Sequence, residues 1–175
     1  KKEQGEAFNN NDTDQLNEVN AFCEQQAQNI KKLSLELLNN NKIPLILGGD
    51  HSSPLGLINA LAEKHEDFGI LQIDAHADLR DAYEDFTASH ASIMFNALKQ
   101  PQISKLVQLG VRDICQDEMD FINNSNNRIK TFLDWDLKAE QYQGKTWQQQ
   151  CNEIIKELPT KVYISMDMDG LDPKL

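Results

Sequence analysis

The chain has 175 residues, a formal net charge of −11, 39% hydrophobic residues and 7% aromatic residues, which suits a single domain over residues 1–175. The acidic charge argues against a nucleic acid or an anionic membrane as partner, because either would be repelled over most of the surface. With no apolar run long enough for a bilayer span and no apolar signal core, a cytoplasmic protein is expected.

Hydrophobic periodicity predicts alternating helices and strands after a polar, Asn-rich loop at residues 1–13. The predicted helices cover residues 14–40, 54–62, 90–98, 117–122 and 147–158, and the predicted strands cover 43–47, 69–73, 106–111, 129–133 and 162–165. Strands that are almost continuously apolar and alternate with helices are typical of an α/β protein. We therefore expect a mostly parallel sheet with helices on both faces.

Three short acidic clusters follow three of these strands. They are Gly48-Gly49-Asp50-His51, Asp74-Ala75-His76-Ala77-Asp78 and Ser165-Met166-Asp167-Met168-Asp169. Because the carboxyl ends of parallel strands open onto one crevice, the clusters are expected to meet there. A two-metal site follows from the number of ligands, since carboxylates can bridge two cations and one zinc ion does not need so many. The predicted ligands are His51, Asp74, His76, Asp78, Asp167 and Asp169.

The first cluster also has a purely structural interpretation. A tight strand-to-helix turn, in which Asp50 and Ser52 cap the next helix, explains it without any ligand. The place of His51 just past a strand end favours a side chain that points into the crevice. We therefore predict that His51 is a ligand and that Asp50 supports it as a hydrogen-bond acceptor.

In the other two clusters the ionisable residues alternate along the chain. Asp74, His76 and Asp78 share one side if the strand continues, and their burial would need a counter-charge that a metal supplies; an exposed strand end is the alternative. Asp167 and Asp169 repeat the pattern. A calcium loop does not fit there, because a strand precedes the cluster and the glutamate of an EF-hand is absent. The following Asp172-Pro173 is interpreted as structural.

His90 is the candidate for proton transfer. It lies twelve residues after Asp78, at the start of a predicted helix, where a loop could return it to the site. A histidine has the neutral-range pKa that proton transfer requires. An ordinary capping histidine explains the same position equally well.

With the three clusters in this order and at these spacings, the chain resembles the ureohydrolase family of arginase, agmatinase, formiminoglutamase and guanidinobutyrase over about residues 43–173. The resemblance implies an arginase-like three-layer α/β/α fold, two Mn²⁺ ions, homo-oligomers, and hydrolysis of a small cationic guanidino compound to urea and an amine. It implies that His90 shuttles protons. It also implies one manganese on His51, Asp74, Asp78 and Asp167, and another on Asp74, His76, Asp167 and Asp169, so that Asp74 and Asp167 bridge.

Within the family, the segments Asp78-Leu79-Arg80-Asp81-Ala82-Tyr83 and Ser89-His90-Ala91-Ser92-Ile93-Met94 look most like agmatinases, which implies agmatine as substrate and putrescine and urea as products. Arg80 stands where arginases carry an asparagine, and it leaves formiminoglutamase open because an arginine can bind a substrate carboxylate. Family members are longer. The chain is therefore expected to be a fragment of the domain, incomplete at both ends, with the guanidinium-binding glutamate beyond Leu175.

Two further interpretations remain. A deacetylase-like zinc hydrolase also uses an Asp-x-His pair and a distant aspartate, but around one zinc, and it would not need His51, Asp78 and Asp169. A non-catalytic subunit could keep the fold and the metal without the reaction.

Overall fold

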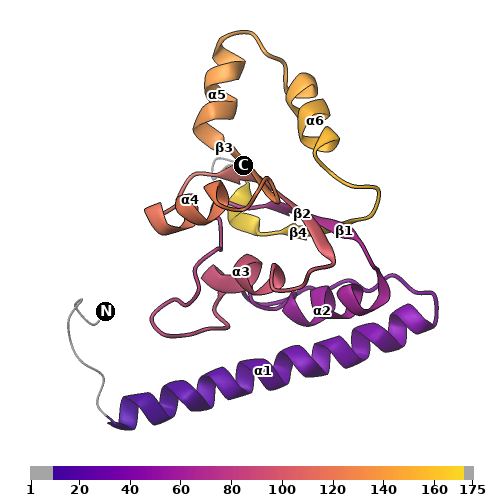
Figure 1. The fold of residues 1–175 in the computed structure, drawn as a ribbon, viewed down its shortest axis with the longest axis vertical. Helices are drawn as coiled ribbons and strands as arrows, with labels where there is room; N and C mark the ends of the chain where they lie inside the picture. The colour runs from indigo at the N-terminus through magenta and orange to yellow at the C-terminus, as the bar shows by residue number, and fades with distance from the viewer. Residues whose placement is uncertain (1–9, 172–175) are drawn as a thin grey trace.

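The computed structural model describes residues 10–171, which form a four-stranded parallel sheet and its surrounding helices (Figure 1). The strands are β1 (Phe68–Ile73), β2 (Ile103–Val111), β3 (Ile129–Leu133) and β4 (Val162–Met166), in the order β3-β2-β1-β4. The helices are α1 (Asn10–Asn39), α2 (Leu55–Lys64), α3 (Ile93–Ala97), α4 (Gln116–Asn123), α5 (Asp134–Tyr142) and α6 (Trp147–Lys156), with the 3-10 helices η1 (His90–Ser92) and η2 (Met168–Gly170).

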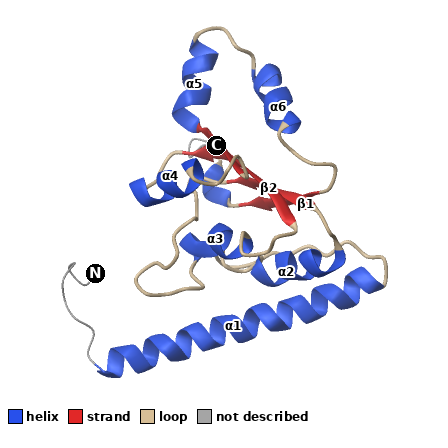
Figure 2. Cartoon of the chain, viewed as in Figure 1, coloured by secondary structure: helices blue, strands red, loops and turns tan. Residues whose placement is uncertain are grey.

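Helices lie on both sides of the sheet, as predicted. Figure 2 shows α1, α2 and α3 on one side of the strands and α5 and α6 on the other. The buried apolar core joins the sheet to α2 and α3; its fully buried members include Ile58, Phe68, Ile70, Ile93, Met94, Ile103 and Leu106. Each such side chain contributes about 1.5–3 kcal/mol by leaving water. This core fixes the strands whose carboxyl ends carry the acidic clusters.

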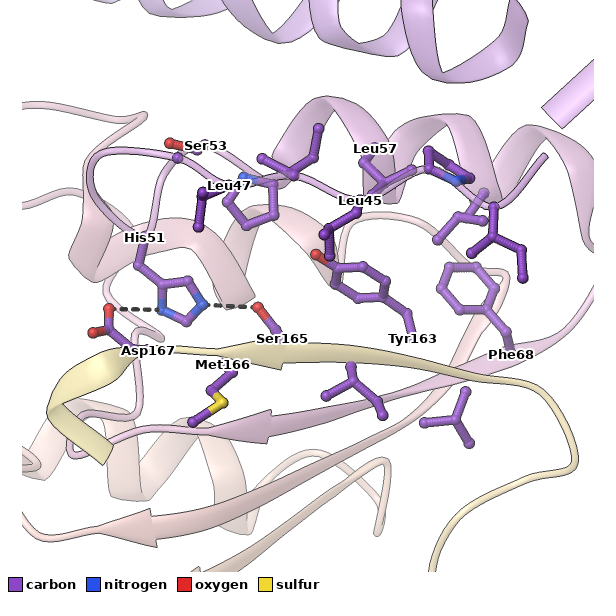
Figure 3. Close-up of a pocket in the computed structure, with 18 of the residues that line it drawn as sticks. Leu45, Leu47, His51, Ser53, Leu57, Phe68, Tyr163, Ser165, Met166 and Asp167 are labelled. Carbon is purple, nitrogen blue, oxygen red and sulfur yellow. Dashed lines mark hydrogen bonds and ion pairs between the residues drawn. The ribbon is translucent and has the colours of Figure 1, made fainter. Parts of the chain in front are cut away.

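The strand predicted at residues 43–47 is wrong. This segment has no regular secondary structure, and Ile43, Leu45 and Leu47 are 97%, 88% and 98% exposed. It faces β4 across a cavity of about 970 Å³ that both segments line (Figure 3). An apolar run forms a strand only where a neighbouring strand accepts its hydrogen bonds, and no strand among residues 10–171 lies next to this one.

The helices differ from the prediction in two places. Helix α5 was not predicted, because Leu137 is its one buried residue and a single apolar position gives no helical period. Helix α1 begins at Asn10, inside the stretch predicted as a loop, while residues 1–9 and Asp172-Pro173 lie outside the described part of the chain. No helix within residues 10–171 is long and apolar enough to cross a membrane.

Gly56 sets the distance between α1 and α2. A Cβ at this position would lie 2.4 Å from the carbonyl oxygen of Ala27 and 2.7 Å from the Cβ of Ile30. Neither the backbone of α1 nor a branched side chain can move aside without moving the helix. Glycine therefore allows the two helices to pack at this crossing.

We expect Gly56→Ala to lower the free energy of unfolding by about 1–3 kcal/mol through overpacking, although alanine is the better helix former. Urea denaturation measures the change. The matched control is Gly49→Ala, whose new Cβ would meet no atom within 4 Å; it should change stability by less than about 0.5 kcal/mol. A Gly56→Ala chain as stable as the wild type would contradict this helix crossing.

Candidate metal centre

The pairing of β1 with β4 places two carboxylates side by side. Asp74 follows β1 and Asp167 follows β4, and the last residues of these strands, Ile73 and Met166, are partners in the parallel register. The Asp167 N–H donates to the carbonyl oxygen of Ile73 over 2.9 Å, which extends the pairing by one residue. The sheet itself therefore brings two of the three acidic clusters together.

His51 reaches the same place from the loop that precedes α2. Its Nδ1 lies 2.8 Å from Oδ2 of Asp74, 2.8 Å from Oδ2 of Asp78 and 3.7 Å from Oδ2 of Asp167. Figure 3 shows the ring between Asp167 and Ser165, whose Oγ lies 2.8 Å from Nε2. His51, Asp74 and Asp78 are buried, so this part of the site is shielded from water.

A second group of ligand atoms forms on the exposed side of Asp74. His76 Nδ1 lies 3.0 Å from Oδ2 of Asp169 and 3.6 Å from Oδ1 of Asp74. The His76 and Asp169 side chains are 47% and 46% exposed. This half of the site is therefore open to solvent.

The two groups share Asp74. One consists of His51, Asp74 and Asp167 and the other of Asp74, His76 and Asp169, with the ligand atoms of each group within 4.8 Å of one another. Asp78 joins the first group through its contact with His51. The structure thus brings all six predicted ligands together. The expected bridge by Asp74 matches this grouping, whereas Asp167 belongs to the first group alone.

The Asp-x-His-x-Asp cluster reaches the site through a turn, which begins where the predicted strand ends, so the condition of a continuing strand is not met. Strand β1 ends at Ile73, and Asp78 has a left-handed φ of 55°. The Gln72 side chain holds the turn, because its Nε2 donates to Oδ2 of Asp74 and to the carbonyl oxygen of His76. Hydrogen bonds to this buried glutamine therefore replace the strand pairing.

Helix η2 positions Asp169 because Gly170 packs against the end of β1. A Cβ at Gly170 would lie 2.8 Å from the backbone nitrogen of Asp74. This close approach allows the Ala75 N–H to donate to Oδ1 of Asp169 over 3.2 Å, while the Asp169 N–H donates to Oδ1 of Asp167 over 3.2 Å. Asp169 is thereby directed toward His76.

The buried groups of this cluster shift one another's ionisation. Burial by itself would lower the pKa of His51, but hydrogen bonds to Asp74 and Asp78 raise that pKa to about 10. Burial and the charge of Asp74 raise the pKa of Asp78 to about 6, against the contact with His51. Burial by itself would raise the pKa of Asp74, but hydrogen bonds from His51, the His76 N–H and Gln72 lower that pKa below its usual value. The imidazolium of His51 occupies the position that suits a metal ion among these carboxylates.

Asp50 and His90 stand apart from the two ligand groups. Oδ1 of Asp50 accepts hydrogen bonds from the N–H and the hydroxyl of Ser52, which is the turn-capping arrangement and gives His51 no hydrogen bond. Burial opposes the ionisation of Asp50, but the bonds from Ser52 lower its pKa, and the charge of His90 contributes. His90 is exposed at the start of η1, and its ring packs edge-on at 5.8 Å from the ring of Tyr83.

Three residues around the ligands were not predicted. Gln72 and Ser165 contact Asp74 and His51, and each precedes a ligand aspartate by two residues inside an apolar strand. A single polar residue in such a strand was the available signal. The third residue is Asp113, whose Oδ2 lies 3.7 Å from Nε2 of His76. No local pattern marks it, because it meets His76 only through the bridge between the ends of β1 and β2.

Known proteins share both the sequence and the fold. An N(1)-aminopropylagmatine ureohydrolase of Thermus thermophilus is 32% identical over 157 residues, or 90% of this chain and 50% of the relative. Another from Synechocystis sp. is 33% identical over 138 residues, or 78% of this chain and 42% of the relative. The chain thus spans about half the length of these relatives.

Solved structures agree. The agmatine ureohydrolase of Thermoplasma volcanium aligns with a TM-score of 0.70 and 25% identity over 87% of this chain and 48% of that one. An arginase from Medicago truncatula aligns with a TM-score of 0.71 and 28% identity over 86% of this chain and 46% of that one. The family model described as the Arginase family matches residues 2–175. The arginase-like fold expected from the three clusters is confirmed, and this chain belongs to the arginase family.

Proposed function

We propose that this chain carries the binuclear manganese centre of a ureohydrolase that hydrolyses agmatine to putrescine and urea. The observation that supports the proposal is the pair of ligand groups that share Asp74 at the ends of β1 and β4. The residues proposed to hold the two ions are His51, Asp74, Asp78 and Asp167 for one, and Asp74, His76, Asp167 and Asp169 for the other.

The donor set fits two manganese ions. Four carboxylates and two imidazoles make an oxygen-rich set, which suits manganese better than softer metals. Two divalent cations neutralise four aspartates, so a guanidinium would meet no net positive charge. The single zinc of a deacetylase-like hydrolase would leave one of the two groups unused. The geometry therefore favours the ureohydrolase over that alternative.

The proposed reaction divides between the metal ligands and His90. Two divalent cations bound there would lower the pKa of water and so would supply a nucleophile at neutral pH. His90 is proposed to protonate the departing amine, because it is exposed and a histidine has the neutral-range pKa that proton transfer requires. The exposed side of the centre, at His76 and Asp169, is where a substrate would enter.

The surroundings of Arg80 favour a substrate without a carboxylate. Nε of Arg80 lies 3.9 Å from Oε2 of Glu118, which is 3% exposed, and the guanidinium lies 5.2 Å from the ring centroid of Tyr83. The positive charge that a formiminoglutamate or arginine carboxylate would need is thus already paired. The relatives named agmatine or aminopropylagmatine ureohydrolases point to the same class of substrate.

Metal content tests the centre. After treatment with a chelator and reloading with Mn²⁺, the wild-type chain should bind close to two ions. Asp74→Asn should lose both because both groups use this carboxylate, whereas Asp169→Asn should keep about one in the buried group. Elemental analysis of the desalted protein gives the stoichiometry.

The control for metal content is Asp67→Asn, an exposed aspartate just before β1, at the opposite end of the strand from the site. It should bind as much Mn²⁺ as the wild type. Fewer than one ion on the wild-type chain would reject the binuclear centre.

Metal affinity should rise with pH. The pKa of His51 is raised to about 10, so its proton competes with the metal at every lower pH. Between pH 6.5 and 9, each added pH unit should raise the apparent affinity by up to about tenfold, since one proton leaves His51. Calorimetry in buffers of different ionisation enthalpy counts the protons released. His51→Gln should lose this component, and a pH-independent wild-type affinity would contradict the role of His51.

Product release tests the reaction. Of agmatine, arginine and formiminoglutamate, the Mn²⁺-loaded protein should turn over agmatine fastest. His90→Asn should lower kcat by about 100-fold or more while its metal content stays unchanged. A chain that binds two ions but turns over none of the three compounds would favour the non-catalytic subunit.

A further inference from the structure

A row of four polar side chains crosses the whole sheet directly beneath the metal centre. Thr131 on β3 pairs with Gln108 on β2, Gln108 pairs with Gln72 on β1, and Gln72 pairs with Ser165 on β4. Gln72 and Gln108 are fully buried and Ser165 almost so. Buried amides cost free energy unless every group is hydrogen-bonded, so the bonds of this polar row have to be followed one by one.

The donors of Thr131, Gln108 and Gln72 point in one direction. Thr131 Oγ1 donates to Oε1 of Gln108 over 2.7 Å, and Gln108 Nε2 donates to Oε1 of Gln72 over 2.7 Å. Gln72 Nε2 then donates to Oδ2 of Asp74 over 2.8 Å. Because each amide oxygen is held by the preceding donor, neither glutamine can flip without losing two hydrogen bonds. The NH₂ group of Gln72 is therefore kept facing the shared carboxylate.

The remaining N–H of each glutamine holds the backbone of the ligand turn. Gln72 Nε2 also donates to the carbonyl oxygen of His76 over 3.2 Å, and Gln108 Nε2 donates to that of Ala77 over 2.7 Å. These two carbonyls lie just before Asp78, where the chain adopts its left-handed φ. The polar row thus fixes the path of the chain between Asp74 and Asp78.

At its other end the polar row contacts His51. Ser165 Oγ lies 2.8 Å from Nε2 of His51, on the opposite side of the ring from the carboxylates that surround Nδ1. A partner on one ring nitrogen determines which nitrogen faces the metal. Ser165 therefore directs Nδ1 of His51 toward the centre.

We propose that Thr131, Gln108, Gln72 and Ser165 are positioning residues for the metal centre. Without binding metal themselves, they orient the shared carboxylate of Asp74 and the ring of His51 and so set the affinity for the ions. This role rests on the proposed function, since it presupposes the centre. If the hydrogen bonds of the row only paired buried polar groups, they would stabilise the fold and leave metal affinity unchanged.

The first test compares two buried glutamines. Gln72→Met removes the donor to Asp74. The control is Gln150→Met, which removes a buried glutamine of α6. The Gln150 side chain donates to Leu137 and Glu140 of α5 and accepts a hydrogen bond from Gln141. Both variants should be less stable to urea. Titration with Mn²⁺ should show an affinity about 10- to 100-fold weaker for Gln72→Met, and the wild-type affinity for Gln150→Met.

The second test uses Thr131, which is remote from every ligand and covers the case in which Gln72→Met does not fold. Thr131→Val keeps the shape of the side chain but removes the hydroxyl that donates to Gln108, so the Gln108 amide loses the hydrogen bond to its oxygen. Thr131→Ser restores the hydroxyl. We expect a several-fold weaker Mn²⁺ affinity for the valine variant and recovery toward the wild-type affinity for the serine variant.

The outcomes separate this inference from the proposed function. A wild-type chain that binds Mn²⁺, together with folded Gln72→Met or Thr131→Val variants that bind it equally well, overturns the positioning role alone. A wild-type chain that binds no Mn²⁺ overturns the proposed function and this role with it. Weaker binding in Thr131→Val that Thr131→Ser reverses supports the role, because a loss of packing alone would not return with the hydroxyl.

Discussion

The burial of one carboxylate governs the arrangement of this molecule. Asp74 is 1% exposed and remains ionised, since its pKa is lowered. A buried charge of this kind is tolerated only where donors and a cation surround it. The donors come from three places: His51 from the loop before α2, the His76 N–H from the following turn, and Gln72 from β1 itself. The fold around the site is organised to supply these partners.

The two halves of the site differ in their exposure to solvent. His51 and Asp78 are held in a buried environment with few alternative positions, which makes that half pre-organised for an ion. His76 and Asp169 are half-exposed and lie where η2 turns away from β4. Water and a substrate can reach that half. Asp74 belongs to both groups and so joins the open half to the buried one.

Local sequence pattern marked the six residues that the structure brings together but not their surroundings. Asp74 and Asp167 follow parallel strands whose ends converge, whereas His51 reaches the same place from a loop. The strand at 43–47 failed because its apolar pattern says nothing about which strand lies beside it. The turn at Asp78 was not predicted, because period-two spacing also suits a strand, and only the contacts of Gln72 and Gln108 reveal the bend.

The polar row could not be predicted from the sequence, for a related reason. Gln72 and Ser165 are single polar residues in apolar strands, whereas Gln108 and Thr131 lie in strands with other polar residues, and neither pattern indicates a row. Their common level depends on the register of four strands that are far apart in the sequence. Register is a property of the assembled sheet, so no single segment encodes the row.

The proposed metal binding would be coupled to the folding of this chain. The carboxylates of Asp74 and Asp78 both lie 2.8 Å from one imidazole, and without that cation their repulsion would oppose folding. In the metal-free protein, the burial of the apolar core must offset this repulsion. An ion that displaces the proton of His51 brings two charges in place of one, so the native state gains stability in proportion to the logarithm of the free metal concentration. The hydrogen bonds of the polar row connect Asp74 to β1, β2 and β3, so the stability gained on metal binding would depend on these three strands.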